Sequence, residues 1–314
     1  MILLKLVPTE TRIPFLRARK VCLTISGAMA AASIVLLLVL GLNFGIDFKG
    51  GTLMEVRTNV AIADVSAIRN QVGTAGLSDV QIQEFGAPNE VLIRVGQQAG
   101  GEKAQQDVVK KVKAALGASV EFRRVEVVGP TVSGELIQSG IISVISAIIA
   151  VLIYIWFRFE WQFSIGAVTA LVHDVVLTLG LFSLLQLEFN LSIIAAILTI
   201  VGYSLNDTVV VFDRVRENLR KYKKMPMVEL LDLSINNTLS RTVLTSVTTL
   251  LALISLYVFG GEVIRGFTFA MIWGVLIGTY SSVFIASPIL LALDVKRNWT
   301  GKALAKPDGK PAIT

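Results

Sequence analysis

The sequence predicts an α-helical integral membrane protein with six transmembrane helices and a small α+β domain, outside the cytoplasm, between helices 1 and 2. Of the 314 residues, 54% are hydrophobic and only 17% are charged, whereas soluble domains carry roughly a quarter charged residues. The apolar residues also gather into runs of about 20, the length that a helix needs to cross a bilayer core about 30 Å thick. Most of this apolar surface is therefore expected to face lipid.

The apolar runs cover residues 21–42, 136–157, 163–185, 191–212, 242–259 and 266–293. The first run is too long for the apolar region of a signal peptide, and no A-x-A-like site ends it, so we expect a retained anchor. It contains Cys22, the only cysteine, which excludes an intramolecular disulfide. Four runs carry no charge, while Asp174 lies in the third and Asp207 in the fourth.

Lysine and arginine gather in three places: the N-terminal tail, the loop between the fourth and fifth runs, and the C-terminal tail. With six spans all three lie on one side, which the positive-inside rule assigns to the cytoplasm. The net charge of +6 then reflects this bias and attraction to anionic membrane lipid, and does not indicate nucleic-acid binding. The expected organisation is a cytoplasmic tail 1–20, helix 1 at 21–42, an outside domain 43–135, helices 2–6 within 136–293 and a cytoplasmic tail 294–314.

The outside segment has the composition and patterns of a small folded domain. Alternating apolar residues predict four strands and three- and four-residue spacing predicts two helices, in the order Thr52–Thr58, Ile62–Val72, Val80–Phe85, Val91–Val95, Lys103–Leu116 and Val120–Val128. The order β-α-β-β-α-β is typical of a ferredoxin-like domain. A fold is not a function, and binding a polypeptide, docking a partner and bracing the helices all stay open.

Asp207 and Arg241 are the first candidate site residues. An ionisable side chain at membrane depth costs roughly 2.5–3.5 kcal/mol and therefore needs a partner or a purpose. Arg241 heads a stripe of threonines that opens the fifth span, so we expect it to face Asp207 across a small polar cavity near the cytoplasm. A carboxylate that alternately pairs with an arginine and takes up a proton would form a proton relay. The alternative is a static pair that holds helices four and five together.

Asp174 and the adjacent His173, the only histidine, are weaker candidates for the same relay. We expect Asp174 to lie deeper in the membrane than Asp207, on the neighbouring helix. A single buried aspartate is equally able to bond a serine or a backbone group, and His173 to be an ordinary packed side chain. The last span repeats a small residue every four positions, from Gly266 to Ala286, which allows close helix packing or sliding.

Four motifs together resemble the SecF family of bacterial protein-export subunits. They are LNFGIDFKGGT after the first span, VGPTVSGEL before the second, LVHDVVLTLG in the third and GYSLNDTVVVFDRVREN across the fourth. The resemblance runs from about residue 40 to residue 290, in the family's order and topology.

The resemblance implies a function, partners and site residues. SecF pairs with SecD, associates with the SecYEG channel and often YajC, and belongs to the RND superfamily, which uses proton flow; here it would promote late-stage export of unfolded preproteins across the bacterial inner membrane. In the family an aspartate of the fourth span and an arginine opening the fifth are tied to proton transport, and they match Asp207 and Arg241. The resemblance also implies that the membrane–domain junction is shaped by Gly45, Asp47, Gly50 and Gly51. It implies no cofactor.

Three other functions compete with this one. An RND-type exporter of small molecules or lipids shares the proton machinery but normally has large outside domains in two duplicated halves. An intramembrane aspartyl protease would need a GxGD motif, whereas Ser204-Leu205-Asn206 precedes Asp207. The sequence also has no HExxH or GxSxG motif, so we expect neither a metal site nor an enzyme. A purely structural scaffold, and sodium in place of protons, stay open.

Overall fold

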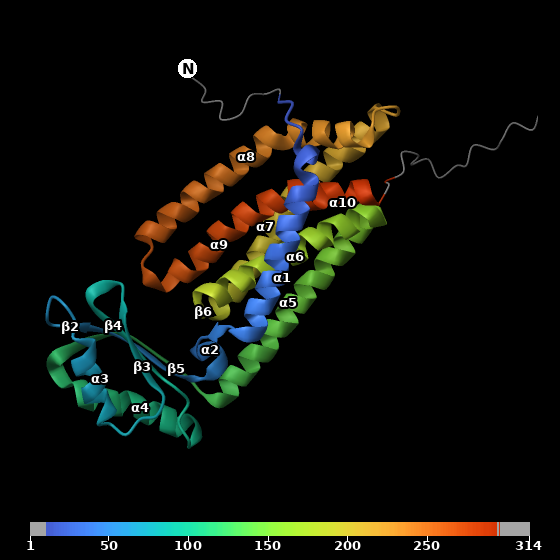
Figure 1. Cartoon of the computed structure of the whole chain (residues 1–314). Helices are drawn as coiled ribbons and strands as arrows, with labels where there is room; N and C mark the ends of the chain where they lie inside the picture. The colour runs from blue at the N-terminus through green and yellow to red at the C-terminus, as the bar shows by residue number, and fades with distance from the viewer. Residues whose placement is uncertain (1–10, 294, 296–314) are drawn as a thin grey trace, which may run out of the picture.

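The computed structural model describes residues 11–293 and 295, and Figure 1 shows them as a bundle of long helices with a smaller domain at one end. Six helices in the described residues are long and apolar enough to cross a membrane, which agrees with the predicted number. They are α1 (Arg19–Val39), α5 (Pro130–Arg158), α6 (Trp161–Leu185), α7 (Leu191–Lys221), α8 (Met227–Phe259) and α9 (Glu262–Ser281). The sixth continues through a π-helical segment, Ser282–Ala286, into α10 (Ser287–Ala292). Most of the two expected tails lies outside the described residues.

Two helices extend well beyond the apolar runs that predicted them. α7 continues to Lys221 rather than ending near residue 212, and α8 begins at Met227 rather than at residue 242. The added turns are amphipathic: Leu230, Leu231 and Ile235 are fully buried in one cluster with Leu16 and Leu219. Hydropathy alone missed these turns because only one face of each is apolar.

The smaller domain is one antiparallel four-stranded sheet with two helices on one face (Figure 1). Its elements are β2 (Gly51–Thr58), α3 (Val65–Gly73), β3 (Val80–Phe85), β4 (Ala87–Val95), α4 (Gly101–Leu116) and β5 (Val120–Val128), and the strand order is β3-β4-β2-β5. The predicted order of strands and helices is therefore present. One face of the sheet packs its apolar side chains, such as Met54 and Ile93, against Val72 of α3 and Val112 of α4.

The opposite face of the sheet is not covered by α3 or α4 and points towards the helical bundle. Leu53 and Leu92 of this face pack against Ile46 of the short helix α2 (Ile46–Lys49). The two parts are also joined by a two-residue parallel pairing of β1 (Asn43–Phe44) with β6 (Glu188–Phe189). This pairing places the start of the outside domain against the connection between α6 and α7.

The small residues of the last span are used for packing within this chain. A Cβ atom at Gly274 would lie 2.2 Å from a side-chain carbon of Ile200, and one at Gly278 would lie 2.9 Å from Cβ of Ser204. Both neighbours belong to α7, so the glycines allow α9 to lie directly against that helix. Of the two uses that the sequence left open, the structure shows close packing.

Candidate functional site

Asp207 is buried in the middle of α7, with 4% of its surface exposed. Its Oδ1 accepts a hydrogen bond of 3.2 Å from the Thr242 hydroxyl of α8. Its Oδ2 is buried and has no hydrogen-bond partner among the described residues. One oxygen of this carboxylate is therefore buried without a hydrogen bond from the described residues, which is rare for a buried polar atom.

Arg241 does not pair with Asp207 as the sequence led us to expect. Its side chain is exposed, and within the described chain no ion pair of 4.0 Å or less joins it to Asp207. The reason is helical geometry: successive residues differ by about 100° around a helix axis. Thr242 therefore faces α7 and bonds Asp207, while its neighbour Arg241 is exposed and acts on the carboxylate only through its charge, without direct contact.

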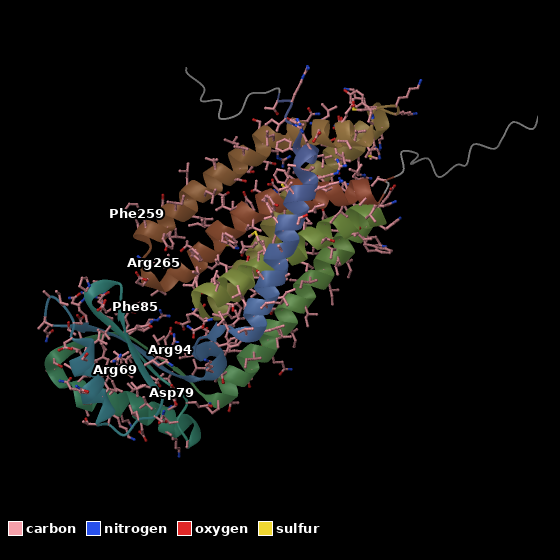
Figure 2. The ribbon with its side chains drawn as sticks, viewed as in Figure 1. Arg69, Asp79, Phe85, Arg94, Phe259 and Arg265 are labelled. Carbon is pink, nitrogen blue, oxygen red and sulfur yellow. The ribbon has the colours of Figure 1, made fainter. Side chains whose placement is uncertain are left out.

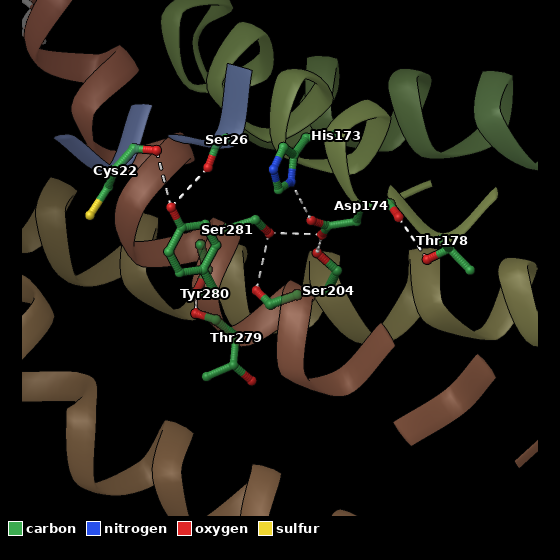
Figure 3. Close-up of polar contacts among 11 residues, drawn as sticks. Cys22, Ser26, His173, Asp174, Thr178, Ser204, Thr279, Tyr280 and Ser281 are labelled. Carbon is green, nitrogen blue, oxygen red and sulfur yellow. Dashed lines mark hydrogen bonds and ion pairs between the residues drawn. The ribbon is translucent and has the colours of Figure 1, made fainter. Parts of the chain in front are cut away.

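Asp174, by contrast, is fully surrounded by donors at the meeting point of three helices (Figure 3). It is 1% exposed. Its Oδ2 accepts hydrogen bonds from Ser204 of α7 at 2.6 Å and from Ser281 of α9 at 2.7 Å. Its Oδ1 lies 3.0 Å from Nδ1 of His173. The sequence reasoning missed Ser281, because nothing in a serine-containing apolar span shows which hydroxyl meets a carboxylate on another helix.

His173 is part of this cluster and not only a packed side chain. It is 7% exposed, and its second nitrogen, Nε2, is buried without a partner among the described residues. Its ring lies 6.3 Å from the ring of Tyr280, whose hydroxyl is 2.8 Å from the Ser26 hydroxyl of α1. A ring contact between His173 and Tyr280 therefore lies between the hydrogen bonds of Asp174 and those that Tyr280 makes to α1 (Figure 3).

The two aspartates are linked through α7. Ser204, which donates to Asp174, is three residues before Asp207, so the two side chains lie about one turn apart on one helix. On α9 the π-helical segment begins directly after Ser281, and such segments are frequent at functional sites. The site thus consists of two polar clusters about one helical turn apart: Asp174 with residues of α6, α7 and α9, and Asp207 with Thr242 of α8.

The junction residues predicted from the family motif touch the beginning of α7. Asp47 Oδ2 accepts a hydrogen bond of 2.9 Å from the backbone N–H of Leu191, the first residue of that helix. The N–H of Gly45 donates to the carbonyl of Phe189 at 2.8 Å, and a Cβ there would lie 2.6 Å from a carboxylate oxygen of Glu188. The helix that carries Asp207 is therefore fastened at its start to this motif.

Gly50 and Gly51 turn the chain from α2 into β2. Their φ angles are 69° and 130°, which favour glycine. A Cβ at Gly51 would also lie 2.5 Å from the carbonyl oxygen of Val95. Any other residue would therefore strain or displace this junction.

An ion pair between Arg94 of β4 and Glu188 of β6 joins the sheet to the same connection. Burial raises the pKa of Glu188, and the nearby Arg94 opposes part of that rise. The junction therefore contains a carboxylate that is partly desolvated but has a cation beside it.

Together these features define a class: a multi-helix membrane protein with carboxylates buried between its helices and an α+β domain fastened to the helix that carries one of them. In the described residues no cluster of His, Cys, Asp or Glu could hold a metal ion.

Comparison with known families identifies the class more closely. The family described as "Protein export membrane protein SecD/SecF, C-terminal" matches residues 108–296, and the "SecD/SecF GG Motif" matches residues 35–61. The chain belongs to the SecD/SecF family of protein-export membrane proteins.

Individual relatives agree with this assignment. The chain is 51% identical over 310 residues to "Protein translocase subunit SecF" of Rhodobacter capsulatus, covering 94% of this chain and 93% of the relative. It is 45% identical over 293 residues to "Protein translocase subunit SecDF" of Brucella abortus, covering 93% of this chain and 39% of the relative. The crystal structure of SecDF from Thermus thermophilus matches with a TM-score of 0.80 and 34% identity, covering 92% of this chain. This chain spans 39% of that SecDF. The resemblance to SecF is confirmed, and the chain is a multi-pass membrane protein of the Sec protein-transport pathway.

Proposed function

We propose that this chain is the SecF-type subunit of the Sec translocase and that, with SecD, it uses the proton motive force to promote late-stage export of preproteins. The observation that carries the proposal is the state of Asp207. A buried charge with no cation in contact and one oxygen unpaired is expensive in its ionised form, and protonation removes that cost. A group of this kind inside a membrane helix is suited to bind and release a proton.

In this proposal Arg241 is the partner of Asp207 when the carboxylate is ionised. One residue step around α8 separates it from Thr242, so a rotation of α8 by about 100° would exchange the hydroxyl for the guanidinium opposite Asp207. The ionised carboxylate is then stabilised by a cation and the protonated one by a hydroxyl. Asp174 and His173 belong to the relay through Ser204, which lies one turn from Asp207.

Among the proposed partners, SecD is supported by the relatives. The SecDF proteins of Brucella abortus and Thermus thermophilus are more than twice as long as the part that this chain matches, which supports a separate SecD as the partner. SecYEG, YajC and the unfolded preprotein complete the assembly. Both termini then lie in the cytoplasm and residues 43–135 in the periplasm, with the chain in the inner membrane.

The proposal is tested by export with Asp207→Asn beside the unaltered protein, in cells that lack the native copy. Processing of a secreted preprotein is followed while the proton or the sodium gradient is collapsed separately, and the amount of each variant in the membrane is checked by blot. We expect normal accumulation, export at the deletion level and dependence on the proton gradient. Asp213→Asn is the matched control, since Asp213 lies on the same helix but pairs with Arg158 at an exposed site. Unchanged export with Asp207→Asn would mean that the carboxylate only fastens helices.

A further inference from the structure

A basic pocket lies at the end of the helical bundle away from the outside domain, which is marked by Arg69 and Asp79 in Figure 2. The pocket forms where the end of α5 meets the last turns of α7, and its volume is about 610 Å³. Its lining residues are Arg158, Asp213, Arg216, Glu217, Arg220 and Lys221. The volume lies within the roughly 300–1,000 Å³ of sites that bind small molecules.

The lining of this pocket carries more positive than negative charge. Four cations line it, against the two carboxylates Asp213 and Glu217. Both carboxylates are already paired: Asp213 lies 2.7 Å from Arg158, and Glu217 lies 2.8 Å from Arg214. An excess of positive charge therefore remains in the lining, and such a surface attracts anions.

Two of the cations are held in position by one aromatic ring. The guanidinium groups of Arg158 and Arg216 lie 4.9 Å and 5.4 Å from the centroid of the Phe159 ring, which is buried. Arg216 also donates a hydrogen bond of 3.3 Å to the carbonyl of Arg158. Planar guanidinium groups bind phosphate oxygens through paired N–H donors, and groups that are already positioned lose less entropy on binding. The pocket is therefore preorganised for a phosphate group.

The position of the pocket along α7 places it at the level of lipid headgroups. The apolar run of the fourth span ends at residue 212, and Arg216 follows about 6 Å further along the helix. The headgroup region extends about 5–7 Å beyond each side of the hydrocarbon core. On either side of Arg158 in the chain, Trp156, Phe157 and Trp161 expose more than half of their surface, as is typical of aromatic residues at a membrane interface. The phosphate that is abundant at this depth belongs to membrane lipid.

We propose that this pocket binds the phosphate of an anionic phospholipid, whose acyl chains lie against the outer surface of α5. Tyr154 is exposed one turn before Arg158 on the same face, and Ile153 is exposed beside it. Because the lining has an excess of positive charge, it favours a headgroup with a net negative charge over a zwitterionic one, whose own cation it repels. The inference goes beyond the proposed function, since neither the proton relay nor the partners require this site.

The lipid selectivity of the pocket is measured by tryptophan fluorescence of the full chain in lipid discs. Trp156 and Trp161 report the lipid beside the pocket when Trp273→Phe and Trp299→Phe remove the other two tryptophans. The discs mix phosphatidylglycerol with phosphatidylcholine, and one or the other lipid carries bromine, a quencher, at equal content. We expect the ratio of phosphatidylglycerol to phosphatidylcholine beside these tryptophans to be about fivefold higher than in the whole disc, the effect of two exposed ion pairs. Equal ratios would overturn the proposal.

Two double variants locate the selectivity. Arg216→Gln/Arg220→Gln removes two cations of the pocket and should return the lipid ratio to that of the whole disc. The control Arg17→Gln/Lys20→Gln removes the same charge around the start of α1, at exposed residues that do not line the pocket. We expect the control to keep the enrichment. An equal loss in both variants would assign the enrichment to general attraction between a basic surface and anionic lipid, and would contradict the proposal.

A third variant keeps the test decisive if the loss of Arg216 disturbs folding. Asp213→Asn removes a negative charge from the lining and leaves all four cations, so we expect the enrichment of phosphatidylglycerol to rise about twofold. An unchanged or lower enrichment would contradict the proposal.

Inorganic phosphate separates the two sources of the anion. Added to the discs, it should leave the enrichment of phosphatidylglycerol in place, because the lipid is held by its acyl chains as well as by its charge. If low concentrations of phosphate abolished the enrichment, the pocket would take phosphate from solution and the lipid would not be its ligand.

Discussion

Two aspartates are buried on neighbouring helices, and they differ in how completely they are partnered. Asp174 of α6 receives hydrogen bonds from two serines and contacts His173, whereas Asp207 of α7 receives one hydrogen bond and keeps one oxygen unpaired. Their exposed fractions, 1% and 4%, are almost equal. Equal burial therefore accompanies very different partnering. Asp174 ties three helices together, whereas Asp207 keeps one oxygen available for a new partner.

The strongest test of this contrast replaces each aspartate with leucine, which is similar in size. Asp174→Leu leaves the Ser204 and Ser281 hydroxyls and a His173 nitrogen without their acceptor, so we expect a loss of about 3 kcal/mol in the free energy of unfolding. Asp207→Leu removes an already unpaired oxygen and should change that free energy by less than about 1 kcal/mol. Unfolding in detergent, followed by denaturant titration, measures both. Similar losses of unfolding free energy for the two variants would show that the number of hydrogen bonds does not set how much each aspartate stabilises the fold.

The contrast is sharpened by removing the donors one at a time. Ser204→Ala or Ser281→Ala deletes one of two hydrogen bonds to the same oxygen of Asp174, and we expect each to cost about 1 kcal/mol, the typical net contribution of an intramolecular hydrogen bond. The control is Ser255→Ala, an exposed serine that bonds only Leu251 of its own helix. The same detergent titration applies. If neither variant differed from the control, the three-helix cluster would not stabilise the bundle.

A third carboxylate, Glu188, is only half-buried, lies outside the spans and has a cation beside it, so it extends the comparison with a smaller effect. Because burial raises its pKa, the folded chain holds this proton more tightly than the unfolded chain. Its contribution to stability is therefore fully present below the unfolded pKa and is lost as pH rises through the folded value. We expect Glu188→Gln to remove this pH dependence at little cost at neutral pH. Arg94→Met, which leaves the carboxylate without its cation, should cost roughly 1–2 kcal/mol there.

The unfolding midpoint, recorded from about pH 4.5 to 7.5, checks both variants. Arg57→Met is a suitable comparison, since Arg57 pairs with Glu90 within the sheet alone. A Glu188→Gln variant that kept the pH dependence of the unaltered chain would assign that dependence to another group.

Most of the architecture was predictable because it depends on patterns of single segments. The six apolar runs predicted the long helices, and period-two alternation predicted the four strands. The prediction failed where tertiary packing decides. The early turns of α8 are helical because Leu230 and Leu231 bury against other helices, and the two-residue pairing of β1 with β6 has no local signal.

The candidate site was only partly predictable for the same reason. The energetic cost of charge in a membrane identified Asp174 and Asp207 from sequence, since that cost does not depend on neighbours. The neighbours themselves could not be predicted. A shift of one residue around α8 decides whether Arg241 or Thr242 faces Asp207, and helical spacing within one segment does not fix that rotation. Ser281 was missed because its role depends on where α9 crosses α6.

The glycines of α9 have a mechanical consequence. With Gly274 against Ile200 and Gly278 against Ser204, neither helix can slide along the other without lifting a side chain over its neighbour, so α7 and α9 form one stiff unit. The start of α7 is also tied to Asp47 at the base of the outside domain. A displacement of α7 at the depth of Asp207 would therefore also move the segment that joins the bundle to the outside domain.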